Sequence, residues 1–146
     1  MDGKDLRIIE ELKENGREST TRIAGKLNMP RVTVHERIKR LVEERVIKRF
    51  TVQLDYHKLG LSTTAFVLVS FSSTTGKTQS ELAEEIARIP NVFEVHIISG
   101  EWDLVVKARA GSVEELGDLV VNRLRLLKGV EKTISCFSFR GVKEEV

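Results

Sequence analysis

The spacing of apolar positions changes near residue 47, and this change divides the chain into two parts. Before it, apolar residues recur every three or four positions, the period of an amphipathic helix. After it, apolar and polar residues begin to alternate, as they do along a strand with one buried face. A chain of 146 residues can form one or two domains, and the change of period favours two.

Residues 19–46 are predicted to form two helices joined by a tight turn. Ile23 and Leu27 are four apart on one face of the first helix, whose start is marked by the hydroxyl residues at 19–21. Asn28 tolerates the left-handed backbone that a sharp turn between helices needs. Pro30 suits the first position of the next helix, where its missing N–H would have had no partner.

The second helix of this pair is predicted over about residues 30–44. Its apolar stripe is expected to be buried and consists of Val34, Ile38, Leu41 and Val42. A helix that enters the DNA major groove contacts base edges through its N-terminal residues. We therefore expect base contacts from Arg31, Val32, Thr33, His35 and Glu36, and phosphate contacts from Arg37, Lys39 and Arg40. The alternative is an ordinary amphipathic helix with a solvated charged face.

Positive charge is concentrated on the helix pair. Residues 15–50 contain 10 Lys and Arg against 4 Asp and Glu, a net charge of +6, whereas the whole chain carries only +2. Such a local excess attracts a polyanion and releases its counterions on binding. The pattern therefore favours double-stranded DNA as a partner.

A helix that precedes the pair completes a three-helix core. Its apolar stripe is predicted to be Leu6, Ile9 and Leu12, with Ile8 beside them. Its acidic residues are expected to form a patch away from the recognition helix, at Asp2, Asp5, Glu10, Glu11 and Glu14.

The second part of the chain contains two successive β-α-β units. A strand is first predicted over 47–54, and it needs a partner strand because one strand is not stable alone. The strands and helices that follow are predicted at 64–71, 78–88, 92–99, 103–110, 113–127 and 131–139. This order is that of a ferredoxin-like fold with an antiparallel sheet. The predicted class is α+β, with a winged-type helix-turn-helix at 1–46, a strand linker at 47–62 and the ferredoxin-like domain at 63–146.

The sheet of the second domain is expected to have an apolar face that the helices do not cover. The strand at 64–71 is apolar on both faces, and the last strand places Ile134 and Cys136 on one side and Phe137 and Phe139 on the other. An exposed apolar patch of this kind usually packs against a partner. We therefore predict a homodimer that packs sheet to sheet.

The loop between the second and third strands of the sheet has two interpretations. Gly100 can supply the unusual backbone angle of a hairpin turn. The loop can also bind a small molecule: Asp103 would pair with an ammonium group, and Trp102 would cover an apolar part of the ligand. Spacing alone favours the hairpin.

The chain resembles the Lrp/AsnC, or feast/famine, transcriptional regulators over nearly its whole length. The resemblance rests on residues 5–9, 21–24, 33–41 and 46–47, and on the loop at 100–103. It implies an N-terminal helix-turn-helix and a C-terminal ferredoxin-like domain that binds amino acids and assembles dimers into larger rings such as octamers. It also implies effector contacts at Gly100, Glu101, Trp102 and Asp103, with Thr133 and Ser135 of the last strand as weaker candidates. Asn28 stands where the turn of this family usually has glycine.

Other functions find less support in the sequence. An enzyme is not expected, because His35, His57 and His96 lie in three different elements and no phosphate-binding glycine loop is present. Cys136 alternates with apolar residues and is expected to be a buried core thiol. No cofactor or metal is predicted. An architectural DNA-binding protein without an effector, and an effector sensor that has lost DNA binding, remain alternatives.

The predicted function is that of a sequence-specific regulator of transcription whose assembly or DNA binding responds to a small molecule, expected to be an amino acid. A single cysteine, and the absence of a signal peptide or a membrane-spanning apolar run, predict a cytoplasmic protein without a membrane partner.

Overall fold

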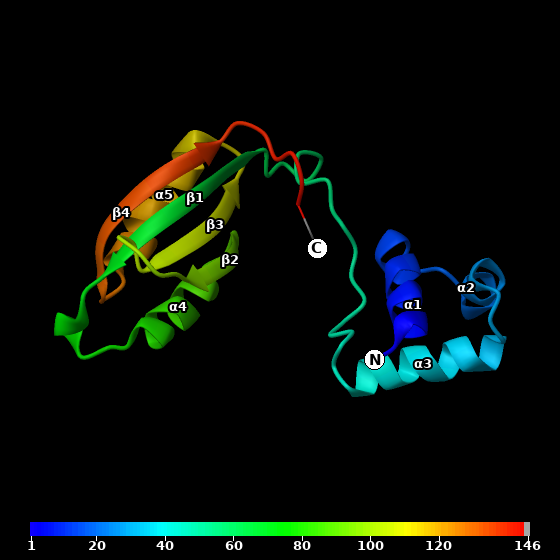
Figure 1. Cartoon of the computed structure of the whole chain (residues 1–146). Helices are drawn as coiled ribbons and strands as arrows, with labels where there is room; N and C mark the ends of the chain where they lie inside the picture. Colours follow the sequence, from blue (N-terminus) through cyan, green and yellow to red (C-terminus); the bar gives the residue numbers. More distant parts are fainter. Residues whose placement is uncertain (145–146) are drawn as a thin grey trace. The chain divides into compact units, whose positions relative to one another are not determined.

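The computed structural model describes residues 1–144 and divides the chain into two compact units (Figure 1). The first unit comprises Met1–Leu54, and the second begins at Asp55. The final two residues of the predicted 63–146 domain lie outside the described residues.

The N-terminal unit contains three helices: α1 (Gly3–Glu14), α2 (Thr20–Leu27) and α3 (Arg31–Glu43). Asp2 caps α1 in a capping box with Asp5, and the Ser19 side chain accepts a hydrogen bond at the start of α2. Asn28 ends α2 with a left-handed backbone at φ 51°, as predicted for the turn. Pro30 is the residue before α3 and not its first helical residue, so the predicted start is one position early.

The core of this unit differs from the predicted stripe on α1. Ile8 is fully buried and packs with Ile23 and Val34, whereas Leu6 is 51% exposed. The reason is the spacing of Asp5, Ile8 and the half-buried Leu12 along the helix, which places these three residues on one face. The predicted stripe on α3 also needs correction at its end, because Leu41 is buried but Val42 is 41% exposed.

The strand predicted over residues 47–54 is not formed. These residues have irregular structure, and no β-wing follows α3 among residues 44–62. A strand is stabilised by hydrogen bonds to a neighbour, and the single chain provides no neighbouring strand here.

The second unit has the predicted βαββαβ order and is an antiparallel ferredoxin-like sheet with helices. Its elements are β1 (Thr63–Phe71), the 3₁₀ turn η1 (Ser73–Thr75), α4 (Gln79–Ala87), β2 (Val92–Ile97), β3 (Leu104–Ala110), α5 (Val113–Asn122), the 3₁₀ turn η2 (Leu124–Leu126) and β4 (Val130–Ser138). The strand order is β2-β3-β1-β4 (Figure 1). The helix predicted over 113–127 ends earlier, at Asn122, and the separate 3₁₀ turn η2 follows it.

One face of this sheet forms the core and the other lies open in the single chain. Val67 and Val69 of β1 are fully buried with Leu82 of α4 and Leu116 of α5, so both helices cover the same face. The opposite face of β1 and β4 presents exposed apolar side chains, which are Phe66, Ile134 and Cys136.

Cys136 is therefore not the buried core thiol that its apolar neighbours suggested. It pairs in register with Phe66 of β1, which is 38% exposed. Directly opposite residues of antiparallel strands share a face, so both lie on the open side.

Among residues 1–144, no helix has both the length and the apolar character needed to cross a membrane.

Candidate nucleic-acid interface and effector loop

The exposed face of α3 brings together most of the predicted base-contacting side chains. Val32, Glu36 and Lys39 follow one another at spacings of four and three, so they lie on one side of the helix. Val32 is 71% exposed, and Arg31 and His35 are also exposed, so these side chains can reach a partner. Thr33 is half-buried and lies nearer the core.

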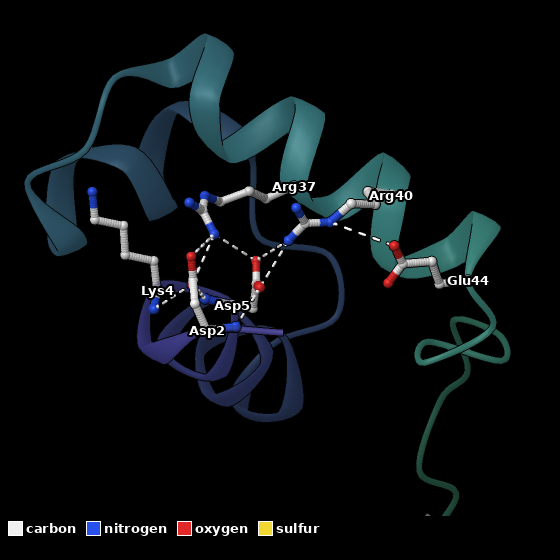
Figure 2. A network of polar contacts seen from close by, with 6 residues as sticks. All are labelled: Asp2, Lys4, Asp5, Arg37, Arg40 and Glu44. Carbon is white, nitrogen blue, oxygen red and sulfur yellow. Dashed lines mark hydrogen bonds and ion pairs between the residues drawn. The ribbon is translucent and has the colours of Figure 1, made fainter.

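Arg37 and Arg40 project from α3 toward the start of α1, as Figure 2 shows. Nη1 of Arg37 lies 2.8 Å from both carboxylate oxygens of Asp2 and 2.8 Å from Oδ1 of Asp5. Nη2 of Arg40 donates to both oxygens of Asp5, at 2.9 and 2.8 Å. The prediction that the acidic residues of α1 lie away from the recognition helix is therefore wrong for Asp2 and Asp5.

Asp5 is the centre of this network. Its side chain is fully buried, and besides the two arginines it accepts a hydrogen bond of 2.8 Å from the backbone N–H of Asp2. Burial alone would raise the pKa of Asp5, but these hydrogen bonds and the charge of Arg40 lower it below its usual value. The hydrogen bond from Arg37 is the largest cause that lowers the pKa of Asp2, from 3.8 to about 2. Both carboxylates are therefore charged at neutral pH.

The predicted phosphate contacts differ in how accessible their side chains are. The side chain of Arg37 is 19% exposed, whereas those of Lys39 and Arg40 are 60% and 46% exposed. Among residues 1–144, the one ion pair seen for Lys39 is a long one, 3.9 Å to Glu43 on its own helix. Lys39 is thus free to move toward a phosphate, and Arg37 is held by two carboxylates.

The loop at residues 98–103 is fixed to the rest of the second unit by Asp103. One carboxylate oxygen of Asp103 accepts a 2.8 Å hydrogen bond from the backbone N–H of Phe71, and the other accepts one of 2.6 Å from Nε2 of Gln79. The backbone N–H of Asp103 donates to the carbonyl of Val69 at 3.0 Å. These bonds join the loop to the end of β1 and the start of α4.

The remaining residues of the loop are more accessible. Gly100 has φ +125°, a backbone conformation that favours glycine, and both Gly100 and Glu101 are exposed. Trp102 is half-buried beside Asp103. The loop thus combines a firmly bound carboxylate, an aromatic side chain and an accessible backbone.

Thr133 and Ser135 lie on β4, on the other side of β1 from the loop. Val69 of β1 pairs with Leu104 on one side and with Thr133 on the other. Two strand spacings, about 10 Å, therefore separate the backbones of β3 and β4 here. Within one chain, Thr133 and Asp103 flank the end of β1 but are not brought into contact by any hydrogen bond seen among residues 1–144.

A charged cluster on β3 was not foreseen from the sequence. Arg109, although only 7% exposed, stacks on the ring of Tyr56 at 4.2 Å and donates to both oxygens of Glu144, at 2.9 and 2.7 Å. Lys107 bridges Glu94 and Glu144 at 3.0 and 3.2 Å. Residues 107 and 109 lie on the face of the sheet opposite the helices, where Tyr56 and Glu144 cover Arg109. In the sequence these charges are signalled only by their alternation with the apolar core positions of β3.

No group of three or more His, Cys, Asp or Glu side chains within residues 1–144 is arranged to hold a metal ion.

The two units correspond to two known domain families. Residues 1–42 match the AsnC-type helix-turn-helix domain, and residues 64–146 match the Lrp/AsnC ligand binding domain. The chain belongs to the Lrp/AsnC family of transcriptional regulators. It carries the DNA-binding helix-turn-helix and the ligand-binding domain of that family, and its relatives are regulators, not enzymes.

Similar proteins span the same length. An HTH-type transcriptional regulator of Pyrococcus abyssi is 52% identical over 146 residues, covering 100% of this chain and 97% of the relative. The proline dehydrogenase transcriptional activator of Rhizobium radiobacter is 31% identical, covering 99% and 92%.

Solved structures share the fold. Bacillus subtilis LrpC has a TM-score of 0.87 and 26% identity, covering 99% of each chain. The transcriptional regulator NMB0573 of Neisseria meningitidis, solved as a complex with L-Met, has a TM-score of 0.92 and 23% identity, covering 99% of this chain and 94% of that one.

Proposed function

We propose that this regulator binds specific DNA sequences through the exposed face of α3. Base edges are contacted by Arg31, Val32, Thr33, His35 and Glu36, and phosphates by Lys39 and Arg40. The observation that carries this proposal is that these side chains, apart from the half-buried Thr33, are exposed on a helix whose opposite side is buried in a three-helix core. A helix-turn-helix domain of the matched family supports the same reading.

Fluorescence anisotropy with a labelled duplex tests the proposal. The duplex is selected by the native protein from a random-sequence library, and a random-sequence duplex serves as competitor. A specific regulator should prefer the selected duplex by about a thousandfold or more, whereas an architectural DNA-binding protein should show little preference. Equal affinity for both duplexes would contradict sequence-specific binding.

The phosphate role of Lys39 has a matched control in the same unit. Lys39→Gln should lower the slope of log K against log salt by about 1, because one phosphate contact is lost. Lys13→Gln removes an equally exposed charge from α1, with side-chain exposures of 63% and 60% for Lys13 and Lys39. The proposal requires that only the α3 variant changes the slope.

We further propose that two chains pack through the open face of the sheet, so that a dimer presents two copies of α3. The exposed apolar side chains of β1 and β4 support this, because an apolar patch of this kind is costly in water. Two copies of α3 are needed because a single one makes too few base contacts for tight, selective binding. Assembly of dimers into larger rings such as octamers belongs to the same proposal. Light scattering that gives a monomer at micromolar concentration would exclude it.

The effector in this proposal is an amino acid that binds around residues 100–103 and shifts the assembly. The ligand-binding domain supports a small-molecule effector. The accessible backbone at Gly100 and the half-buried ring of Trp102 offer polar and apolar contacts, and Glu101, Thr133 and Ser135 are further candidates. The ligand must have different affinities for the two assembly states, or it shifts nothing.

A thermal-shift screen of the twenty amino acids, followed by sedimentation, tests the proposal that an amino acid binds and shifts the assembly. Methionine is a sensible first probe, because NMB0573 was solved as a complex with L-Met. Stabilisation by at least one amino acid, with a change in oligomer size, supports the proposal. If none stabilises the protein while selective DNA binding persists, the function is regulation of transcription without an amino-acid effector.

A further inference from the structure

We infer that Asp2 and Asp5 are positioning residues for DNA reading, which hold α3 at a fixed angle through Arg37 and Arg40. In this arrangement Arg37 links α3 to the start of α1 within the N-terminal unit and does not contact a phosphate. The inference rests on the proposed reading role of α3 and assigns a role to a part of the molecule that faces away from the bases.

The geometry of the network supports a fixed orientation (Figure 2). Five hydrogen bonds of 2.8–2.9 Å join two guanidinium groups of α3 to two carboxylates at the start of α1. Arg37 and Arg40 are one turn apart, so the bonds hold α3 at two points along its axis. Two fixed points restrict rotation of α3 about its own axis, and such a rotation would turn the reading side chains away from the base edges.

Burial distinguishes the pairs made by Asp5 from ordinary surface ion pairs, whereas the side chain of Asp2 is 54% exposed. The Asp5 side chain is fully buried and that of Arg37 is 19% exposed. Charge-assisted hydrogen bonds are shorter and stronger than hydrogen bonds between neutral groups. By contrast, the Lys39–Glu43 pair at 3.9 Å is exposed, and because both residues lie on α3 it does not fix α3 to another helix.

Charge alone predicts the opposite effect from positioning. Asp2 lies on the same unit as α3, and removing its negative charge should strengthen binding to polyanionic DNA through long-range attraction. If Asp2 positions α3, removing its charge should weaken binding although the protein becomes more positive. The sign of the change therefore separates the two roles.

The test is Asp2→Asn in the full chain, with the selected duplex described above as probe. Asn is as good an N-cap as Asp, so the start of α1 is retained while the ion pair with Arg37 is lost. We expect binding to weaken by about fivefold. Glu10→Gln is the control, because it removes the same charge from an exposed position of α1, at 70% exposure, and should not weaken binding.

A double-mutant cycle with Arg37→Gln completes the test. The loss caused by Asp2→Asn should disappear in the Arg37→Gln background, because the pair is already broken. Arg37→Gln should weaken binding but leave the salt slope unchanged, whereas Lys39→Gln should lower the slope by about 1. Circular dichroism at the assay temperature confirms that each variant is folded.

Two outcomes would overturn the inference. One is an Asp2→Asn variant that binds as tightly as the native protein or more tightly, which would mean that the ion pair only stabilises the fold. The other is a salt slope that falls by about 1 in Arg37→Gln, since Arg37 would then be a phosphate contact. A native protein that selects no duplex would instead refute the proposed function.

Discussion

The carboxylate of Asp103 is predicted to stabilise the second unit even when no ligand is present. It accepts hydrogen bonds from the backbone N–H of Phe71 and from Gln79. A hydrogen bond to a charged group contributes about 1.5–3 kcal/mol when buried, and we take about 1 kcal/mol for each bond at this half-buried site. Asp103→Ala should therefore cost about 2 kcal/mol and lower the melting temperature by about 10 °C.

The assay uses the single tryptophan of the chain, which is the neighbour of Asp103. Because Trp102 lies in the second unit, its fluorescence follows thermal unfolding of that unit in the absence of amino acids. Glu101→Ala is the control, since it removes an exposed charge from the same loop. A melting temperature that does not change in Asp103→Ala, or that falls equally in both variants, would refute the argument from hydrogen bonds.

Three further predictions concern the core, the ion pairs and the open face. Ile8 is fully buried, so Ile8→Ala should destabilise the N-terminal unit by about 3 kcal/mol in urea unfolding followed by circular dichroism; a loss below about 1 kcal/mol would contradict its place in the core. The pKa of Asp2 is about 2 in the folded chain against an ordinary 3.8, so its ion pair stabilises the fold above about pH 4 and is lost as the pH falls toward 2. Urea unfolding between pH 5 and pH 2 should show this loss, and Asp2→Asn should reduce it; a pH dependence that is identical in the variant would exclude Asp2 as its source. Cys136 is exposed in the single chain, so a maleimide should react with it fast in dilute monomer and slowly in the proposed dimer. Equal reaction rates would mean that the open face is not the interface.

The secondary structure of the second unit could be predicted because its local signals agree with its packing. Thr78 and Ser112 cap α4 and α5, and the side-chain oxygen of each accepts a hydrogen bond from the backbone N–H three residues later. The alternation along β1 then specifies which face meets these helices, since Val67 and Val69 are buried while Phe66 is not. Local and tertiary preferences point to the same arrangement here.

The buried acid of α1 was missed because charge was given more weight than position. Asp5 precedes Ile8 by three residues, so the helical period places it on the core face. An acid at such a position requires a cationic partner, and Arg37 and Arg40 were available on α3. The spacing could have indicated a buried ion pair, but the choice of partner depends on how α1 and α3 cross, which sequence spacing does not reveal.

The strand predicted at 47–54 and the burial of Cys136 failed for another reason. Both depend on contacts that a single chain does not supply: a neighbouring strand in one case and a cover for the open face in the other. Alternation shows that a segment can form a strand, but a strand forms only where another one donates and accepts its hydrogen bonds.

The central claim, that the exposed face of α3 reads DNA sequence, is tested most directly by selecting duplexes from a random-sequence library with native, His35→Ala and Glu36→Ala proteins. Both side chains are exposed on α3, and neither belongs to the core. Native protein should select one sequence with two half-sites, and each variant should relax the preference at one or two positions of each half-site, by about 1–3 kcal/mol per base pair. Identical selected sequences from all three proteins would contradict the claim.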